Sequence, residues 1–390
     1  MKGGTRSYEM ALRMVASGHE VHMVTSLRDD SLKNKDWLET NVDGIHVHWL
    51  PVKYDNRMSY AERIRAFFKF ALKASKKACS IGGDVIFATS TPLTIAIPAV
   101  KAKKKLGIPL VFEVRDLWPE LPIAIGAIKS LSAKWLATKL ENYAYFNSDH
   151  VIGLSPGMTE GVIKAGYPKN KTSTIPNSCD LDMFNLEKNA GQEFRNRFDW
   201  LQNRPLILYA GTLGHINGVS YLVELASQMC DVNSEVRFLV LGAGVEECEI
   251  REQAKELGVL DKNFFMLEQV NKSQIPSVFK AATVSTSLFV DMPEMWANSA
   301  NKFFDTLASG TPVLINYGGW QKDIIEREDI GITLPPAPTR EAAERLNCLL
   351  CDKERLKRLG DNARAIAERD FSRDKLAREL IQVLEDVVSQ

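Results

Sequence analysis

The chain of 390 residues has no long apolar run and few cysteines. No stretch approaches the ~20 consecutive apolar residues that span a bilayer, and the first residues lack the apolar core of a signal peptide. The six cysteines follow no disulfide framework, which predicts a reducing compartment. We therefore expect a cytoplasmic protein.

Patterns of metal ligands are also sparse. Cys348 and Cys351 form one CxxC inside a helical pattern, with no second pair. His46 and His48 share one face of a predicted strand, where they are either half-buried strand residues or part of a metal pair. We favour the first interpretation, because no third ligand is evident, and predict neither a metal site nor a bound cofactor.

Charge is balanced over the whole chain but not along it. Basic and acidic residues number 49 each, yet residues 1–185 hold 25 basic against 18 acidic ones, so the remainder carries the opposite excess. Either the N-terminal half meets an anionic partner or the two halves complement each other.

The order of the elements predicts an α/β protein. Short apolar strands alternate with amphipathic helices in two series, separated by a polar linker near residues 186–204. We predict two doubly wound, Rossmann-like domains facing a cleft, residues 1–185 and 205–370, and a helix at 371–390 that packs back toward the first domain. The predicted strands are residues 20–25, 45–51, 84–89, 109–114, 150–154 and 172–175, then 206–210, 236–241, 264–267, 285–290 and 313–316.

Residues 298–314 carry the most informative site pattern, a loop followed by a helix, a turn and a short strand. The loop leaves backbone N–H groups at a helix N-terminus, which favours an anion. Lys302 in the first turn opposes the helix dipole unless an anion lies beside it, and Asp305 suits the hydroxyls of a ribose. The stretch predicts a nucleoside diphosphate site, with an ordinary helix bearing a surface Lys–Asp pair as the alternative.

Residues 59–78 predict an amphipathic helix with a basic surround. Phe70 is expected to lie off the apolar stripe, toward the basic side. The helix either faces the core or touches an anionic membrane surface or lipid-linked acceptor, at the inner face of the cytoplasmic membrane. The predicted stripe consists of Ile64, Phe67, Phe68, Ala71 and Leu72.

Several motifs, in order, resemble the retaining nucleotide-sugar glycosyltransferases of the GT-B fold, glycosyltransferase family 4. They are GGTRSYEMALRMVASGHEVHMVTS, EVRDLWPE, PNSCDLDMF, YAGTLGHINGVSYLVELASQM, VRFLVLGAG and NSANKFFDTLASGTPVL. The first two are most similar to bacterial surface-polysaccharide members, such as those of O-antigen or capsule synthesis. The resemblance implies transfer of a hexosyl or N-acetylhexosaminyl group from a nucleoside diphosphate sugar, with UDP favoured, to a polysaccharide or lipid-linked acceptor, with retention of configuration.

The resemblance also implies roles for single residues. Lys302 resembles the family's phosphate-binding lysine, and Asp305 its ribose-binding acid. Arg115 and Asp116 resemble the pair that lines the sugar and acceptor side of the cleft. The other positions expected around the donor are Gly3, Gly4, Gly211, Thr212, Glu268, Ser299, Ala300 and Asn301.

Two departures from the family pattern concern the donor. Ala297 stands where the family commonly has the first acid of a Glu-x7-Glu pair, and Glu294 is out of register. The basic residues often found after the strand that ends at Gly211 are absent, which leaves Lys302 as the main cation for the diphosphate.

Two alternatives to a transferase stay open at this point. One is a non-catalytic nucleotide-binding remnant or partner subunit, and the other a nucleotide-sugar epimerase of the same fold. An oxidoreductase is disfavoured, because Gly242-Ala-Gly244 lacks the third glycine of the dinucleotide fingerprint. We expect no nucleic-acid partner.

The first domain is expected to lack its first strand. A Gly-rich turn that opens a helix normally follows the central strand, but only Met1 and Lys2 precede Gly3 and Gly4, whereas a strand needs about five or six residues. We predict a vacant or collapsed strand position beside residues 20–25 or 84–89, and either a start upstream of Met1 or an inactive product.

Overall fold

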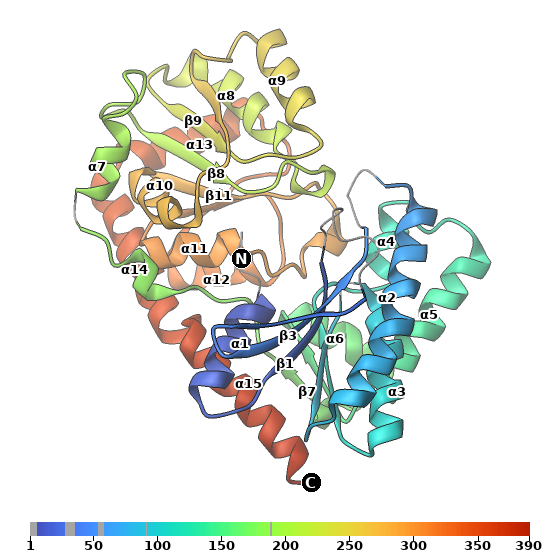
Figure 1. The fold of residues 1–390 in the computed structure, drawn as a ribbon. Helices are drawn as coiled ribbons and strands as arrows, with labels where there is room; N and C mark the ends of the chain where they lie inside the picture. Colours follow the sequence, from blue (N-terminus) through green and yellow to red (C-terminus); the bar gives the residue numbers. More distant parts are fainter. Residues whose placement is uncertain (1–5, 28–35, 54–57, 91, 188) are drawn as a thin grey trace. The chain divides into compact units, whose positions relative to one another are not determined.

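The computed structural model describes residues 6–27, 36–53, 58–90, 92–187 and 189–390 (Figure 1). They form two compact units, which we name the N-unit (residues 6–176 and 376–390) and the C-unit (residues 177–375). The chain passes between them at Pro176–Asn177, earlier than the boundary expected at residue 185, and again at Lys375–Leu376.

The N-unit contains two separate sheets. In the first, β1 (His22–Leu27) pairs in parallel with β3 (Ile45–Pro51), and β2 (Leu38–Val42) adds an antiparallel edge. The second sheet is parallel throughout, in the order β4-β5-β6-β7. Its strands are β4 (Ile86–Thr89), β5 (Leu110–Val114), β6 (His150–Gly153) and β7 (Thr172–Thr174).

The edge strands of the two sheets, β1 and β4, lie on either side of a gap. Among the described residues, β1 and β4 each pair with one neighbour only, and every residue from Val21 to Ser26 and from Val85 to Thr89 lines one cavity of about 1910 Å³. The prediction of a vacant strand position beside residues 20–25 or 84–89 is therefore confirmed.

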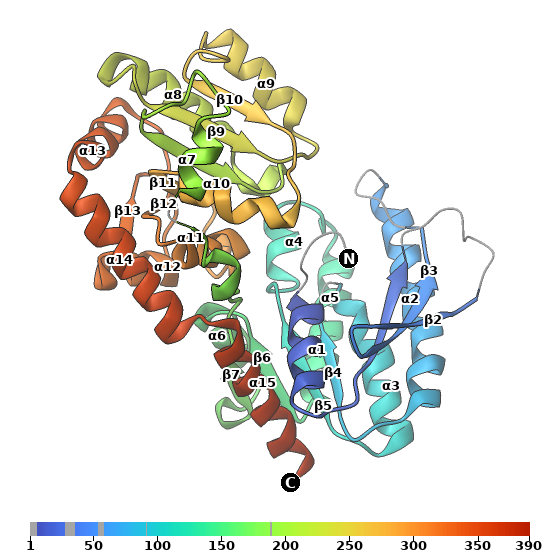
Figure 2. The same cartoon turned by 60° about the vertical axis from the view of Figure 1, so that its left-hand side comes forward.

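Helices cover both faces of the four-stranded sheet (Figure 2). On one face α1 (Arg6–Ala16) and the part of α15 (Arg373–Val388) from Leu376 onward bury Met10 and Leu380 against Val111 and Ile152. Successive side chains of a strand point to opposite faces of the sheet. Phe112 and Val151 are therefore buried on the other face, where they pack against α3, α5 and α6. The remaining helices of the unit are α2 (Tyr60–Ile81), α3 (Ala96–Leu106), α4 (Glu120–Ala124), α5 (Leu131–Phe146) and α6 (Pro156–Lys164).

The helix α2 turns a different face inward from the one predicted. Ser59 and Glu62 form the capping box that starts it. Phe70, however, packs against the buried cluster of Leu50, Val52 and Ala66 instead of pointing to the basic side. Ile64, Phe68 and Leu72 of the predicted stripe are 52%, 45% and 63% exposed. Ala71 of the stripe is buried and Phe67 is half-buried, so the expected core-facing stripe was wrong for three of its five residues. Helical periodicity finds apolar rows but does not show which row has a packing partner.

The C-unit is built on one parallel sheet of six strands, in the order β10-β9-β8-β11-β12-β13. The helices α8 and α13 pack together on one face, over Tyr209, Phe238 and Leu314 (Figure 1). The strands are β8 (Leu206–Ala210), β9 (Arg237–Leu241), β10 (Phe264–Leu267), β11 (Val284–Ser287), β12 (Val313–Ile315) and β13 (Gly331–Thr333). The helices are α7 (Ala190–Arg195), α8 (Ser220–Val232), α9 (Glu247–Glu256), α10 (Ile275–Ala281), α11 (Asn301–Ser309), α12 (Trp320–Glu328), α13 (Arg340–Cys351) and α14 (Lys353–Asp370).

Candidate active site

The helix α11 begins where the carboxyl ends of β8 and β11 meet. Phe303, Phe304 and Leu307 are fully buried and fix the helix to the core of the C-unit. Its N-cap residue, Ala300, has no side chain that can accept from the first turn. The N–H groups of Asn301 and Lys302 therefore begin the helix without a side-chain cap, at its electropositive end.

Lys302 points from this first turn into the loops that follow β8 and β11. Its Nζ lies 3.1 Å from the hydroxyl of Tyr209 and 3.0 Å from Oδ1 of Asn217. The same atom is 4.5 Å from the centre of the Tyr209 ring and 5.2 Å from that of Phe289. Two aromatic faces and two oxygens thus hold the amine in one position. A surface Lys–Asp pair, the alternative for this stretch, is not what the structure shows.

Burial lowers the pKa of Lys302 to about 7. Desolvation disfavours the charged amine, and the described residues around it supply dipoles and ring faces rather than a carboxylate. An anionic ligand at this place would restore the positive charge. A phosphate beside Lys302 would therefore raise its pKa and favour the charged amine.

The loops under Lys302 approach each other with no room for side chains. A Cβ atom on Gly242 would lie 1.9 Å from the carbonyl oxygen of Gly211, and one on Gly244 would lie 2.0 Å from that of Leu213. The N–H of Gly211 donates to the carbonyl of Leu241 over 3.0 Å. Glycine is required at these contacts because backbone packs on backbone. The result is a floor lined by main chain at the carboxyl edge of the sheet, where α/β proteins bind ligands.

Asp305 lies one turn further along α11, in different surroundings. It is half-buried, and burial raises its pKa to about 7 despite the attraction of Arg373 and Lys272. Lys272 follows the carboxyl end of β10, as does the exposed Glu268. Asp305 and Glu268 thus belong to the same unit as Lys302, and their role in binding a nucleotide stays a prediction.

Two of the predicted donor contacts are used within the protein. The Ser299 hydroxyl accepts from the N–H of Asn177 over 3.0 Å, and the Asn177 amide donates to the Ser299 carbonyl. The N–H of Ala300 donates to Oδ1 of Asn298 over 3.2 Å. The Ser299 hydroxyl and the Ala300 N–H therefore stabilise the turn before α11 in this structure. Asn301, the first residue of α11, is exposed. Thr212 is also exposed, and its carbonyl accepts from the Tyr209 hydroxyl over 2.7 Å.

The remaining predicted residues belong to the N-unit. Arg115 and Asp116 are half-buried just after β5, and the Arg115 N–H donates to the Ser90 hydroxyl over 3.0 Å. They stand at the carboxyl end of a parallel strand, as expected. Gly3 and Gly4 lie outside the described residues.

Sequence reasoning did not assign roles to the residues that hold Lys302. Tyr209 is an inward residue of β8, and Phe289 follows β11, so both looked like ordinary core. Asn217 lies in the loop after β8, where the family often has a basic residue. That position was the one sequence feature that could have indicated a contact with Lys302. The contacts become visible only when β8, β11 and α11 come together.

The histidines considered from the sequence lie in the first sheet of the N-unit. His48 is buried and His46 exposed, and both stack with His22, across the β1–β3 pair. Within the described part of the chain, no group of three or more His, Cys, Asp or Glu side chains is arranged to hold a metal ion. A search of the same residues for a helix long and apolar enough to cross a membrane finds none.

Comparison with known proteins identifies the family. A family model described as "Glycosyl transferase 4-like domain" matches residues 3–178, and one described as "Glycosyl transferases group 1" matches residues 191–366. This chain belongs to the glycosyltransferases.

Similar proteins agree with this assignment. This glycosyltransferase is 23% identical over 296 residues to the putative colanic acid biosynthesis glycosyl transferase WcaI of Escherichia coli (strain K12), covering 71% of this chain and 70% of the relative. Sucrose-phosphate synthase from Thermosynechococcus elongatus matches its structure with a TM-score of 0.79 at 18% identity, over 99% of this chain and 94% of the other. HepE from Anabaena, solved with UDP and glucose, matches with a TM-score of 0.73 at 18% identity, over 98% and 96%. The glycosyltransferase thus has the GT-B fold, with two Rossmann-like units built on parallel strands.

Proposed function

We propose that this glycosyltransferase moves a sugar from a nucleoside diphosphate sugar, with UDP as the nucleotide, to a saccharide or lipid-linked acceptor with retention of configuration. The observation that carries the donor is Lys302, a desolvated amine beside the uncapped start of α11. The structure of HepE with UDP and glucose supports the choice of UDP. The name of WcaI supports a polysaccharide acceptor.

In the proposed reaction the bond between the anomeric carbon and the diphosphate breaks as the acceptor oxygen bonds to that carbon. The electron pair of the broken bond goes to the phosphate oxygen, which leaves with the extra charge. Lys302 and the N–H groups at the start of α11 stabilise that charge, a contribution of several kcal/mol for preorganised donors. The acceptor proton leaves with the nucleotide, and attack from the leaving-group face gives retention.

The other predicted residues have positioning roles in this proposal. Asp305 would accept from the ribose hydroxyls, and Glu268 would mark the edge where the base packs. Arg115 and Asp116 would orient acceptor and sugar, without a covalent intermediate. Since Lys302 and main-chain N–H groups stabilise the charge of the leaving diphosphate, we also propose that transfer needs no metal and persists in EDTA.

A nucleotide panel followed by a transfer assay tests the function. UDP should raise the melting temperature of the protein more than GDP, ADP or NAD does. The UDP-sugars that bind are then incubated with extracted saccharide and lipid-linked acceptors, and NMR of the product gives the anomeric configuration. Stabilisation by UDP without turnover of any donor would favour a nucleotide-binding partner subunit, and inversion would remove the retaining mechanism.

A further inference from the structure

The loop between β11 and α11 carries an indole ring that is only partly buried. Trp296 is 39% exposed, although Met295 before it and Asn298 after it in the same loop are buried. Tryptophan has a large apolar surface and is highly buried on average, so an open ring at a ligand-binding edge requires an explanation. The loop leads into the first turn of α11, which carries Lys302.

The backbone after β12 supports one face of this ring. A Cβ atom on Gly318 would lie 3.2 Å from each of three carbons of the Trp296 ring system, which places it over the ring face rather than at the edge. A Cβ atom on Gly319 would lie 2.6 Å from the Trp296 carbonyl oxygen, and Gly319 has a φ of 85°. Glycine is therefore required at this support. The exposed part of the indole is its opposite face and its outer edge.

Hydrogen bonds fix the loop on both sides of the ring. The N–H of Trp296 donates to the Pro293 carbonyl over 3.0 Å, and that of Asn298 donates to the Met295 carbonyl over 3.1 Å. The Asn298 carbonyl accepts from the indole N–H of Trp320 over 2.8 Å. The ring is thus held in one position, which lowers the entropy cost of a contact with a ligand.

Ring contacts connect Trp296 to the site of Lys302 within the C-unit. The ring centre of Phe289 lies 5.2 Å from Nζ of Lys302 and 5.2 Å from the ring centre of Tyr317. Gly318, which supports the indole, follows Tyr317 directly. The exposed face of Trp296 therefore lies near the candidate phosphate site, on its β12 side.

The two sides of Lys302 suit the two ends of a nucleoside diphosphate sugar. Asp305, the candidate ribose contact, is attracted by Lys272, which follows β10. In the strand order β10-β9-β8-β11-β12-β13, the segment that supports Trp296 follows a strand on the other side of β8 and β11. With the diphosphate at Lys302 and the nucleoside toward β10, the sugar lies toward β12.

We propose that Trp296 is a stacking platform for the transferred sugar and a specificity-determining residue, an inference that rests on the proposed function. An aromatic face contacts the C–H face of a pyranose ring through apolar and dispersion contacts. The platform selects a sugar by the shape of that face, whereas Lys302 and the start of α11 bind the diphosphate whatever sugar it carries.

Calorimetry on the full chain separates the sugar contact from nucleotide binding. The probes are UDP, UDP-glucose, UDP-galactose, UDP-N-acetylglucosamine and UDP-N-acetylgalactosamine. For the UDP-sugar that binds the unaltered protein most tightly, Trp296→Ala should raise the Kd about 10-fold, the scale for one aromatic stacking contact. The Kd of UDP should stay unchanged. Trp296→Tyr keeps an aromatic face and should recover most of the affinity.

The control is Trp135→Ala, which removes a tryptophan of the N-unit that is 61% exposed and should change neither Kd. Equal losses for UDP and the UDP-sugar in Trp296→Ala would show that the ring only supports the loop before α11. An unchanged Kd for every UDP-sugar would likewise overturn the platform, and in both cases the proposed function stands. If the unaltered protein does not bind UDP, the proposed function and the platform are both wrong.

Discussion

Lys302 and Asp305 both have pKa values near neutrality, although one is a base and the other an acid. Burial disfavours the charged form of each, so the pKa of Lys302 falls and that of Asp305 rises, in both cases to about 7. Perturbed groups of this kind are concentrated at functional sites. Because both lie on α11, we propose one ligand for the two groups, a nucleoside diphosphate.

Replacing Lys302 should remove most of the transfer activity. We expect Lys302→Ala to lower kcat/KM by about 100-fold or more, the scale for one electrostatic donor to a leaving group. Lys322→Ala is the matched control, because Lys322 is a partly exposed lysine of α12 paired with Glu326. Steady-state kinetics with the best UDP-sugar measures both. Unchanged kcat/KM in Lys302→Ala would exclude the phosphate role.

The affinity for UDP should be greatest near pH 7. Above this pH the free Lys302 is neutral and must take up a proton when phosphate binds, so the Kd rises by up to tenfold per pH unit. Below it Asp305 is protonated and must lose its proton to accept from both ribose hydroxyls, so the Kd rises again.

Variants separate the two limbs of this profile. Calorimetry between about pH 5.5 and 8.5 should show that Lys302→Ala loses the alkaline limb and Asp305→Asn the acid one. The ionisation of UDP itself is common to all three proteins and cancels in the comparison. An alkaline limb that persists in Lys302→Ala would assign it to another group.

Among the elements, α2 and α5 expose several large apolar side chains to water. Ile64, Phe68 and Leu72 lie among the lysines and arginines of α2, and Leu131 and Trp135 of α5 are 83% and 61% exposed. Apolar side chains surrounded by basic ones suit an anionic bilayer surface. We propose this surface as the route to a lipid-linked acceptor.

Liposome flotation tests the surface. The protein should float with vesicles that contain anionic lipid at low salt and much less at high salt. The triple variant Ile64→Ser, Phe68→Ser, Leu72→Ser should lose binding. The double variant Val245→Ser, Leu257→Ser removes exposed apolar residues of the C-unit and should keep it. No flotation of the unaltered protein at low salt would refute the proposal.

The buried ion pair between Arg6 and Glu113 fixes α1 to β5. Both side chains are almost fully buried, so Arg6→Met leaves a carboxylate without its partner. We expect this variant to lose about 3–5 kcal/mol of the stability of the N-unit. The double variant Arg6→Met, Glu113→Gln should recover part of the loss, since the uncompensated charge is gone. Arg13→Met removes a half-buried arginine of the same helix, which is more open to water than Arg6, and is the control.

Urea denaturation, followed by amide exchange in β5 and β6, measures these changes within the N-unit. A loss in Arg6→Met no larger than in Arg13→Met would show that the pair contributes little.

At the scale of the whole molecule, the two chain crossings are tied together within the C-unit. The N–H of Cys179 donates to the Phe371 carbonyl, and that of Arg373 to the Cys179 carbonyl over 3.0 Å. Arg373 also bonds Asp180 over 2.8 Å and the Ser178 carbonyl over 3.0 Å. The segments that enter and leave the C-unit therefore form one strap.

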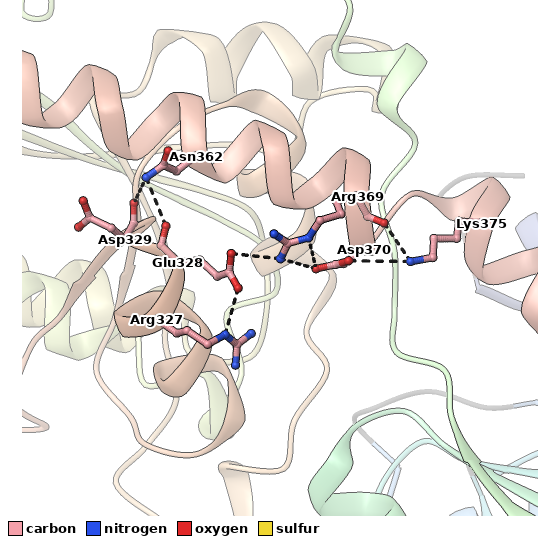
Figure 3. Close-up of polar contacts among 7 residues, drawn as sticks. All are labelled: Arg327, Glu328, Asp329, Asn362, Arg369, Asp370 and Lys375. Carbon is pink, nitrogen blue, oxygen red and sulfur yellow. Dashed lines mark hydrogen bonds and ion pairs between the residues drawn. The ribbon is translucent and has the colours of Figure 1, made fainter.

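A second group of ion pairs lies beside this strap, at the end of α14 (Figure 3). Arg369 bonds Glu328 of α12 and Asp370, and Lys375 donates to the Arg369 carbonyl over 2.9 Å. Arg327 and Asn362 complete the group. Most of these charges are open to water, where ion pairs contribute little.

The strap and the surface group should respond differently to substitution. Arg373→Ala is expected to lower the stability of the C-unit by about 2 kcal/mol, the scale for lost charge-assisted hydrogen bonds, and to speed exchange at Cys179. Arg369→Ala should leave both unchanged. Denaturation with amide exchange distinguishes them, and equal effects would mean that the strap is no stronger than the surface group.

How far the sequence alone predicts this protein differs between elements. The strands of the C-unit from β8 to β12 were predicted because continuous apolar runs bounded by glycine or proline are local signals. β2 and β13 were missed, since LETNV is mostly polar and Gly331–Thr333 is three residues long. Asp352 separates α13 from α14 and caps α14, because its side chain accepts from the N–H of Arg355.

The sequence by itself determined the two α/β units and the place of Lys302 at a helix start. These follow from periodicity and from the order of elements, which are written along the chain. Only the tertiary structure decided that Phe70 is the inward residue of α2, that Ser299 is held by Asn177, and that Tyr209, Asn217 and Phe289 surround Lys302. The physical reason is that burial and hydrogen bonding depend on partners tens of residues away, and the pKa of a lysine depends on those partners rather than on its neighbours in sequence.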